Sequence, residues 1–260
     1  MPGRGGTLHA AWRCVGAEIR IGTSGWEYAH WAGDFYPHGL PKDRWLEHYA
    51  AEFDTVELNN PFYRLPQAYV FARWAKRVPS DFRFAVKASR YLTHIRRLRE
   101  PEEALRRFWT RARRLGVRLG PVLYQLPPRW HPNEERLGAF LEIIPNELQA
   151  VEFRDARWYR RTTFDRMARA GVALCLHDMD GSAAPITPIG PFVYVRFHGA
   201  GARYGGRYSS QRLSAWADRM VEWADADLAV WAYFNNDAGG HAVRDAARLR
   251  TMIDRRRRRP

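Results

Sequence analysis

The sequence predicts an α/β fold of the TIM-like (β/α)8 barrel class, on three observations. The chain has 260 residues, a usual length for one such barrel. From residue 18 onwards, short β-rich runs alternate with helical stretches, and no linker-like segment interrupts them. The polar residues of the β-rich runs also keep to one parity, which is what a sheet with helices covering only its outer face requires.

Eight runs read as strands, the number that closes this barrel. In chain order they cover residues 18–23, 55–59, 83–89, 122–127, 150–154, 173–178, 192–198 and 229–235.

The helices between these strands are marked by their end residues. A helix over residues 102–115 would end at Gly116, and one over 163–170 would end at Gly171. Glycine is favoured there because it readily adopts the left-handed conformation that follows a helix. Asn133 is suited to cap the first turn of the helix that follows it.

The remaining segments give the expected domain limits and one irregularity. Residues 181–190 contain two prolines, so the helix after the sixth strand is expected to be reduced or missing. Residues 1–17, rich in Gly and Arg, are expected to be disordered. We therefore predict a single barrel domain over residues 18–254 and an arginine-rich tail over 255–260.

The parity of the strands places their polar side chains inside the barrel. Glu57 and Asn59 alternate with Val56 and Leu58, and residues 83–89 repeat the pattern. Successive side chains on a strand point to opposite faces, so the apolar parity faces the helices and the polar parity faces inward. Active sites of this fold lie at the carboxyl ends of the strands, so we expect a polar site at that mouth.

This mouth is predicted to hold both catalytic and ligand-binding side chains. The candidate catalytic residues are Glu57, Lys87, Glu152 and His198. The candidate ligand-binding residues are Ser24, Trp26, Asn59, Phe62, Tyr63, Gln125, Arg154, His177, Arg196, Tyr208, Asn235 and Asn236. The alternative is a polar core in which Glu57 pairs with Lys87 and Glu152 with Arg196.

The candidate residues belong to motifs that extend through most of the chain. The motifs are IGTSGW at 21–26, ELNNPFY at 57–63, FAVK at 84–87, QLPP at 125–128, EFR at 152–154, YVRFHG at 194–199 and YFNND at 233–237. Together they resemble the YecE-like family, also called domain of unknown function 72. The resemblance implies a TIM-like barrel, in agreement with the parity argument, and implies no particular reaction.

Several enzyme chemistries stay open on these residues. A two-carboxylate glycosidase would use Glu57 and Glu152, although nearby Lys87 and Arg196 would keep both carboxylates ionised. A Schiff-base enzyme would use Lys87, the only lysine on a predicted strand. The simpler expectation for Lys87 is an ion pair with Glu57, which would raise the pKa of the amine.

A metal-dependent hydrolase is a weaker alternative, and no metal site is predicted. Its ligands would come from Glu57, Glu152, His177, Asp178 and His198. No HxH or HExxH spacing is present and no organic cofactor is indicated, but a divalent metal stays open.

The mixture of basic and amide side chains fits best a small anionic, phosphate-bearing or sugar-like ligand, held by arginine contacts. A glycine-rich segment over residues 199–208 follows the seventh strand, where many barrels bind phosphate. Whether the protein is an enzyme, with hydrolase and lyase the classes considered, or only a binding protein is left open.

The net charge of +14 raises a second hypothesis, a nucleic-acid-binding protein of the phosphodiester-hydrolase repair type. Arginines crowd the third crossover at positions 96, 97, 99, 106, 107, 111, 113, 114 and 118, and recur at 255–259. A solvated helix face, with Leu105 and Phe108 packed beneath it, is the simpler explanation. Phe108 and Trp109 could alternatively stack on bases.

The sequence also gives expectations for location and partners. Cys14 and Cys175 suggest neither a disulfide framework nor a metal motif. No secretion signal or membrane-spanning stretch is evident, so we expect a cytoplasmic protein without a membrane partner. Nothing indicates an oligomeric state.

Overall fold

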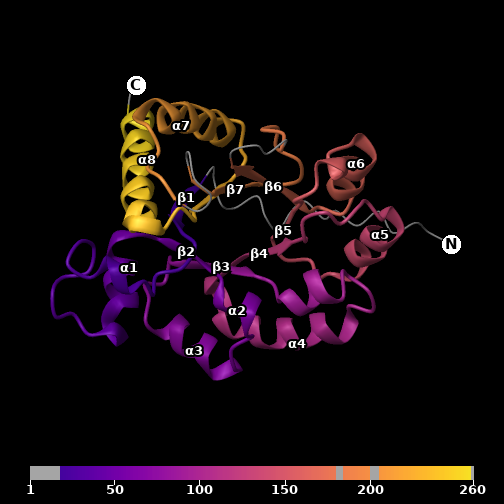
Figure 1. Ribbon diagram of the computed structural model, residues 1–260, viewed down its shortest axis with the longest axis horizontal. Helices are drawn as coiled ribbons and strands as arrows, with labels where there is room; N and C mark the ends of the chain where they lie inside the picture. Colours follow the sequence, from indigo (N-terminus) through magenta and orange to yellow (C-terminus); the bar gives the residue numbers. More distant parts are fainter. Residues whose placement is uncertain (1–17, 180–183, 200–204, 259–260) are drawn as a thin grey trace.

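A computed structural model describes residues 18–179, 184–199 and 205–258. Eight parallel strands lie side by side in the order β1-β8-β7-β6-β5-β4-β3-β2, and helices surround them (Figure 1). This is the predicted TIM-like barrel. Residues 1–17, including Cys14, lie outside the described residues, as do 180–183 and 200–204.

All eight predicted strands are present, with ends that shift by a few residues. They are β1 Ile19–Thr23, β2 Thr55–Leu58, β3 Arg83–Lys87, β4 Leu119–Gln125, β5 Gln149–Glu152, β6 Ala173–Asp178, β7 Val193–Phe197 and β8 Val230–Phe234.

The main helices occupy the crossovers between these strands. They are α1 Trp45–Glu52, α2 Asn60–Tyr63, α3 Ala68–Lys76, α4 Glu102–Ala112, α5 Glu134–Ile143, α6 Arg161–Arg169, α7 Ser210–Asp225 and α8 His241–Arg257. Six short helical turns complete the described elements: η1 Ala29–Trp31, η2 Lys42–Arg44, η3 Tyr91–Ile95, η4 Arg113–Arg118, η5 Ala156–Trp158 and η6 Ala238–Gly240.

The predicted helix ends are confirmed. Gly116 and Gly171 have φ values of 59° and 67°, in the positive range that glycine adopts more readily than other residues. The Asn133 side chain accepts a hydrogen bond of 2.8 Å from the backbone N–H of Arg136. Between β6 and β7, residues 179 and 184–192 contain no helix, as the prolines predicted. Helix α8 continues into the arginine-rich segment as far as Arg257.

The barrel is nearly closed, and its seam lies between β1 and β2, which share no backbone ladder in the described part of the chain. The Tyr49 hydroxyl fills this seam. It accepts a hydrogen bond from the Thr23 N–H at 2.9 Å and donates one to the Thr55 carbonyl at 3.1 Å. The strands also approach closely here, since a Cβ on Gly22 would lie 2.2 Å from the Thr55 carbonyl oxygen.

The inward parity carries two layers of side chains. The lower layer is apolar and fully enclosed, and it contains Ala85, Leu123, Ala150, Ala173, Cys175, Phe192, Tyr194, Trp231 and Tyr233. The upper layer, toward the carboxyl ends of the strands, carries the charged groups described below. The opposite parity, which includes Val56 and Leu58, packs against the helices, as predicted.

Candidate functional site

Two buried carboxylates share one guanidinium at the centre of the mouth. Arg196 on β7 donates from Nη2 to Glu57 Oε1 on β2, and from Nη1 to Glu152 Oε2 on β5, both at 2.8 Å. At most 1% of any of these three side chains is exposed. Strands that are far apart around the barrel are therefore joined by one charged cluster, because their inward side chains converge on its axis.

The other contacts of Glu57 fix that carboxylate in place. Ser24 Oγ donates to its Oε1 and Tyr194 Oη to its Oε2, each at 2.7 Å. Tyr194 was not among the predicted site residues. The strand pattern could nevertheless have identified it, because Tyr194 lies on the same inward face of β7 as Arg196, two residues further along.

Glu152 stays ionised. Burial alone would raise the pKa of its carboxyl group, but the ion pairs with Arg154 and Arg196 hold that pKa well below its usual range. A carboxylate of this kind cannot donate a proton near neutral pH. The site therefore offers no support for Glu152 as the general acid of a glycosidase.

His198 is neutral and orients Arg154. Its Nε2 lies 2.9 Å from Arg154 Nη2, and a guanidinium only donates, so this ring nitrogen must accept. Burial lowers the pKa of His198 to about 3, and the charge of Arg196 adds to this effect despite nearby Glu152. Arg154 also donates from Nη1 to Met179 Sδ at 3.2 Å. Both partners of these terminal nitrogens are thus uncharged.

The predicted Glu57–Lys87 ion pair is wrong. The Glu57 carboxylate accepts hydrogen bonds from Arg196, Ser24 and Tyr194. Lys87 makes no hydrogen bond or ion pair with any described residue. The Lys87 side chain is buried in the mouth, with its Nζ 3.8 Å from the centroid of the Phe62 ring. Burial lowers its pKa to about 7, and the charge of Arg196 contributes in the same direction.

A cluster of ring side chains, formed by Phe62, Tyr63 and His94, lies beside Lys87. Phe62 packs edge-on against His94, which lies on the π-helical turn η3 directly after β3. Burial and the charge of Lys87 lower the pKa of His94 to about 4, so this ring is neutral. Tyr63, at 79% exposed, faces solvent next to Phe62. Such π turns are frequent at functional sites, but the sequence pattern did not single out His94 as a site residue.

Four other predicted residues border the mouth without joining the central cluster. Asn59 donates from Nδ2 to the Ser24 carbonyl at 3.3 Å, and its buried Oδ1 has no hydrogen-bond partner among the described residues. Asn235 lies 3.3 Å from His198 Nδ1. Gln125 ends β4, in register with Glu152 on β5. His177 contacts the Tyr159 hydroxyl at 2.9 Å.

Three predicted residues lie away from the mouth. Trp26 is buried edge-on against Trp74. Asn236 has the outward parity of β8 and donates to the Asp245 carboxylate of α8 at 2.9 Å. Tyr208 is buried, and its backbone N–H donates to the same carboxylate. These side chains hold the surrounding segments in position.

The ligand set considered for a metal-dependent hydrolase does not converge in the described part of the chain. Asp178 accepts hydrogen bonds from Trp216 Nε1 at 2.8 Å and Arg212 Nε at 2.9 Å, on the helix side of β6. Within the described ranges, no group of three or more His, Cys, Asp or Glu side chains is placed to hold a metal ion. The same residues contain no helix long and apolar enough to cross a membrane.

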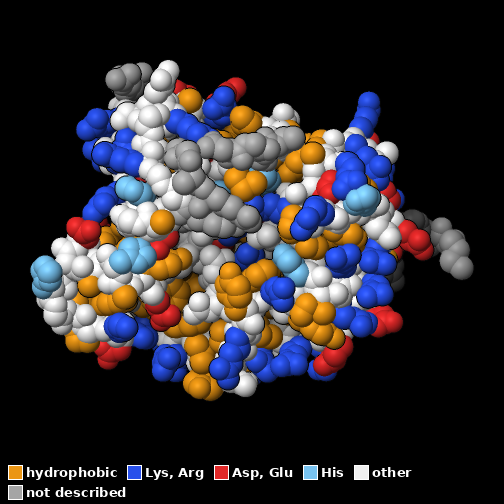
Figure 2. All heavy atoms as spheres, in the orientation of Figure 1, with side chains coloured by type: hydrophobic (Ala, Val, Ile, Leu, Met, Phe, Trp, Pro, Cys, Tyr) orange, Lys and Arg blue, Asp and Glu red, His pale blue; other side chains and the backbone are white. Residues whose placement is uncertain are grey.

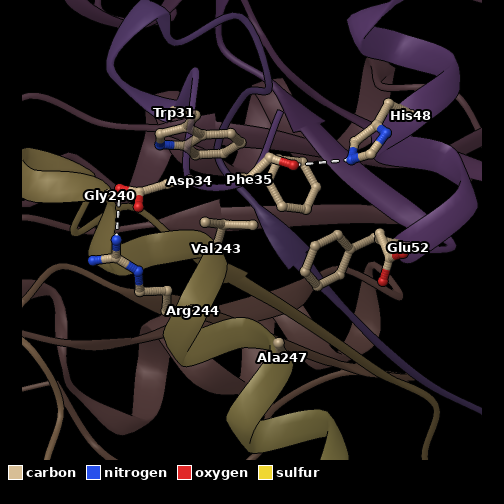
Figure 3. Close-up of a pocket in the computed structure, with 10 residues that line it drawn as sticks. Trp31, Asp34, Phe35, His48, Glu52, Gly240, Val243, Arg244 and Ala247 are labelled. Carbon is tan, nitrogen blue, oxygen red and sulfur yellow. Dashed lines mark hydrogen bonds and ion pairs between the residues drawn. The ribbon is translucent and has the colours of Figure 1, made fainter. Parts of the chain in front are cut away.

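A cavity of about 250 Å³ lies outside the barrel between α1 and α8 (Figure 3). Its walls are mostly apolar, and most of the polar side chains at its edge already have partners. Arg244 pairs with Asp34 at 2.6 Å, and His48 Nε2 lies 2.9 Å from the Phe35 carbonyl oxygen. We regard the mouth as the better candidate, because only the mouth combines buried charges with perturbed pKa values.

The fold and this charged mouth define a TIM-like barrel protein with one polar site at the carboxyl ends of its strands. The chain belongs to the family described as "Protein of unknown function DUF72", whose model matches residues 20–260.

Relatives and solved structures agree with this assignment. The UPF0759 protein YunF of Bacillus subtilis is 26% identical, over 91% of this chain and 95% of its own. The UPF0759 protein YecE of Escherichia coli is 31% identical, over 59% of this chain and 55% of its own. The crystal structure of a DUF72 family protein from Thermotoga maritima has a TM-score of 0.83 and 28% identity, covering 91% of this chain and 99% of that one.

Proposed function

We propose that the protein is an enzyme whose barrel mouth binds a small anionic ligand between Lys87 and Arg154. The observation that carries this proposal is the charge balance of the mouth. Glu57 and Glu152 are neutralised by Arg196 and Arg154, so Lys87 is a buried amine with no counter-ion among the described residues.

The neighbouring groups support the same ligand class. The terminal nitrogens of Arg154 contact the Met179 thioether and the neutral His198 imidazole. A carboxylate or phosphate oxygen would form stronger, charge-assisted hydrogen bonds with these nitrogens. Asn59 Oδ1 is a buried acceptor that a hydroxyl or an ammonium group would satisfy. Free, buried Cys175 is compatible with the reducing cytoplasm that we propose as the location.

Anion binding is expected to be coupled to proton uptake by Lys87. An anion beside the amine favours its charged form, so phosphate binding at pH 8 should raise the pKa of Lys87 and draw a proton from the buffer. Calorimetric titration of inorganic phosphate and of acetate, in buffers of different ionisation enthalpy, measures this uptake. Lys87→Met should abolish the proton uptake and weaken binding by roughly tenfold or more, about the strength of one charge-assisted hydrogen bond.

The matched control is Lys76→Met, since Lys76 is an exposed lysine on α3 outside the mouth. Equal effects of the two substitutions would show that the anion binds elsewhere, and would refute the proposed function.

A further inference from the structure

We infer that Lys87 is a nucleophile that forms a Schiff base, and that its substrate is a small aldehyde or ketone carrying a carboxylate or phosphate group. This inference rests on the proposed anion-binding function of the same mouth and adds the reacting group and the substrate class.

The position of Lys87 suits this role. It ends β3 at the mouth and is 7% exposed, so bulk water is largely excluded from the amine. Its Nζ lies over the Phe62 ring, where the ammonium form gains a cation–π attraction but no hydrogen-bonding counter-ion. The other two lysines, Lys42 and Lys76, are exposed.

The charges around Lys87 keep its amine available. The two nearby carboxylates cannot close on the amine, because Arg196 and Arg154 already hold them. Burial and the like charge of Arg196 outweigh the attraction of Glu152 and Glu57, and the pKa of Lys87 falls to about 7. A desolvated lysine next to another cation is a known way to activate this nucleophile.

The consequence for reactivity is large. With a pKa of about 7, about half of the Lys87 side chains carry a free amine at neutral pH. An exposed lysine with the usual pKa of about 10.4 is unprotonated in roughly one molecule in 2,500 at that pH. Even after allowing for the lower intrinsic nucleophilicity of a less basic amine, Lys87 should react far faster than Lys42 or Lys76.

The covalent step balances with the substrate, the neutral amine and one proton from the solvent. The Nζ lone pair forms a bond to the carbonyl carbon, and the carbonyl π electrons move to oxygen, which takes up the proton released by nitrogen. The carbinolamine then loses its hydroxyl group and its remaining N–H proton as water while nitrogen and carbon form the imine double bond, and the imine nitrogen takes up one proton from the solvent. The protonated imine can accept the electron pair of an adjacent C–C or C–H bond, which is the chemistry of a lyase or an isomerase.

Arg154 provides the reason for an anionic group on the substrate. Its guanidinium faces the same Glu152 as Arg196 does, and among the described residues its terminal nitrogens contact the neutral partners Met179 and His198. A carboxylate or phosphate held there would place a neighbouring carbonyl group toward the Lys87 side of the mouth. Uncharged aldehydes should therefore react more slowly than charged ones.

Reductive trapping tests the inference on the full chain. The protein is incubated with glyoxylate, or with acetaldehyde as the uncharged probe, in sodium cyanoborohydride at pH 7, and the modified peptides are mapped by mass spectrometry. We expect glyoxylate to modify Lys87 about 100-fold faster than Lys42 or Lys76, because its free-amine fraction is roughly 1,000-fold larger and its lower intrinsic nucleophilicity offsets part of that gain. The rate should level off above pH 8, and acetaldehyde should modify Lys87 more slowly.

The outcomes separate this inference from the proposed function. Lys87→Arg keeps the charge, so it should lose the adduct and still bind phosphate. Modification confined to Lys42, Lys76 and the α-amino group, in a protein that still binds phosphate, would overturn the Schiff-base inference alone. A Lys87 adduct in a protein that does not bind phosphate would refute the proposed anion site, but it would still support Lys87 as a nucleophile. A trapping rate that keeps rising to pH 10 would also overturn the inference, because it describes an ordinary lysine.

Discussion

At the scale of single residues, burial has opposite outcomes for two ionisable groups in one mouth. Burial disfavours charge on both Glu152 and Lys87, but Glu152 has two guanidinium partners and remains ionised. Lys87 is attracted only weakly by Glu57 and Glu152, because these carboxylates are paired with arginines. Burial therefore outweighs this attraction and lowers the pKa of Lys87. The difference lies in the pairing, which the parity of the strands alone does not determine. The sequence therefore placed these residues in the mouth correctly and paired Lys87 wrongly.

The lowered pKa of Lys87 predicts a cost to stability. The folded pKa of about 7 lies below the unfolded value of about 10.4, so the unfolded chain binds more protons between these limits. The contribution of Lys87 to stability is full above about pH 10.4 and is lost as the pH falls to 7, by up to about 1.4 kcal/mol per pH unit. Lys87→Met should remove this slope and be the more stable protein at pH 7.

Urea unfolding at pH 7 and pH 9 measures the effect as the difference between Lys87→Met and the unsubstituted chain, which cancels the other titrating groups. Lys76→Met should match the unsubstituted chain at both values. If the difference does not change with pH, Lys87 titrates as an ordinary lysine. Higher stability in the variant would be typical of a functional group that is maintained at the expense of folding.

At the scale of elements, the seam between β1 and β2 shows how a helix can complete a sheet. Tyr49 belongs to α1, yet its hydroxyl replaces a ladder hydrogen bond between Thr23 and Thr55. Arg20 acts in the same seam, donating to the Asp54 carbonyl at 3.0 Å, and Asn59 spans it at the mouth. These contacts maintain the distance between β1 and β2, and hence the positions of Ser24 and Glu57.

Tyr49→Phe should destabilise the protein by about 1–3 kcal/mol, because it leaves a buried N–H and a buried carbonyl group without that partner. Urea unfolding gives the size of the effect, and amide hydrogen exchange at Thr23 should accelerate more than exchange at β6. Tyr69→Phe, at an exposed position on α3, is the control. An unchanged free energy of unfolding for Tyr49→Phe would show that the barrel closes without this bridge.

The elements themselves were largely predictable, and the seam was not. Strand parity, helix-capping residues and prolines are local signals, so all eight strands and the ends marked by Gly116, Gly171 and Asn133 could be found. The seam depends on contacts between residues far apart in the chain. Asn236 and Tyr208 show the same limit, since their shared partner Asp245 lies on α8.

At the scale of the whole molecule, the positive charge is spread and partly paired. Figure 2 shows basic side chains along the edges of this face, with acidic side chains among them. On and beside α4, Arg106 pairs with Glu103, and Arg113 with Glu147. Arg111 instead donates to the Leu65 and Pro66 carbonyls. Phe108 and Trp109 are buried, so they cannot stack on bases, and that part of the nucleic-acid hypothesis is wrong.

Nucleic-acid binding should therefore be weak, peripheral and strongly salt-dependent. Counterion release makes affinity fall steeply with salt when arginines contact only phosphates. In fluorescence-anisotropy titrations with short DNA and RNA, we expect binding at low salt to fall at least tenfold by about 0.2 M salt. The double substitution Arg107→Gln and Arg114→Gln should weaken it, whereas Lys87→Met should leave it unchanged.

Arg161→Gln with Arg169→Gln gives the same change of net charge on α6 and is the matched control. If both double substitutions weaken nucleic-acid binding equally, the protein responds to its total charge and has no specific binding surface on α4 and η4. Binding that survives moderate salt and is lost in Lys87→Met would place nucleic acid in the mouth, and the anion bound between Lys87 and Arg154 would then be a backbone phosphate. That result would also give a role to the buried Lys87 amine, which has no counter-ion among the described residues.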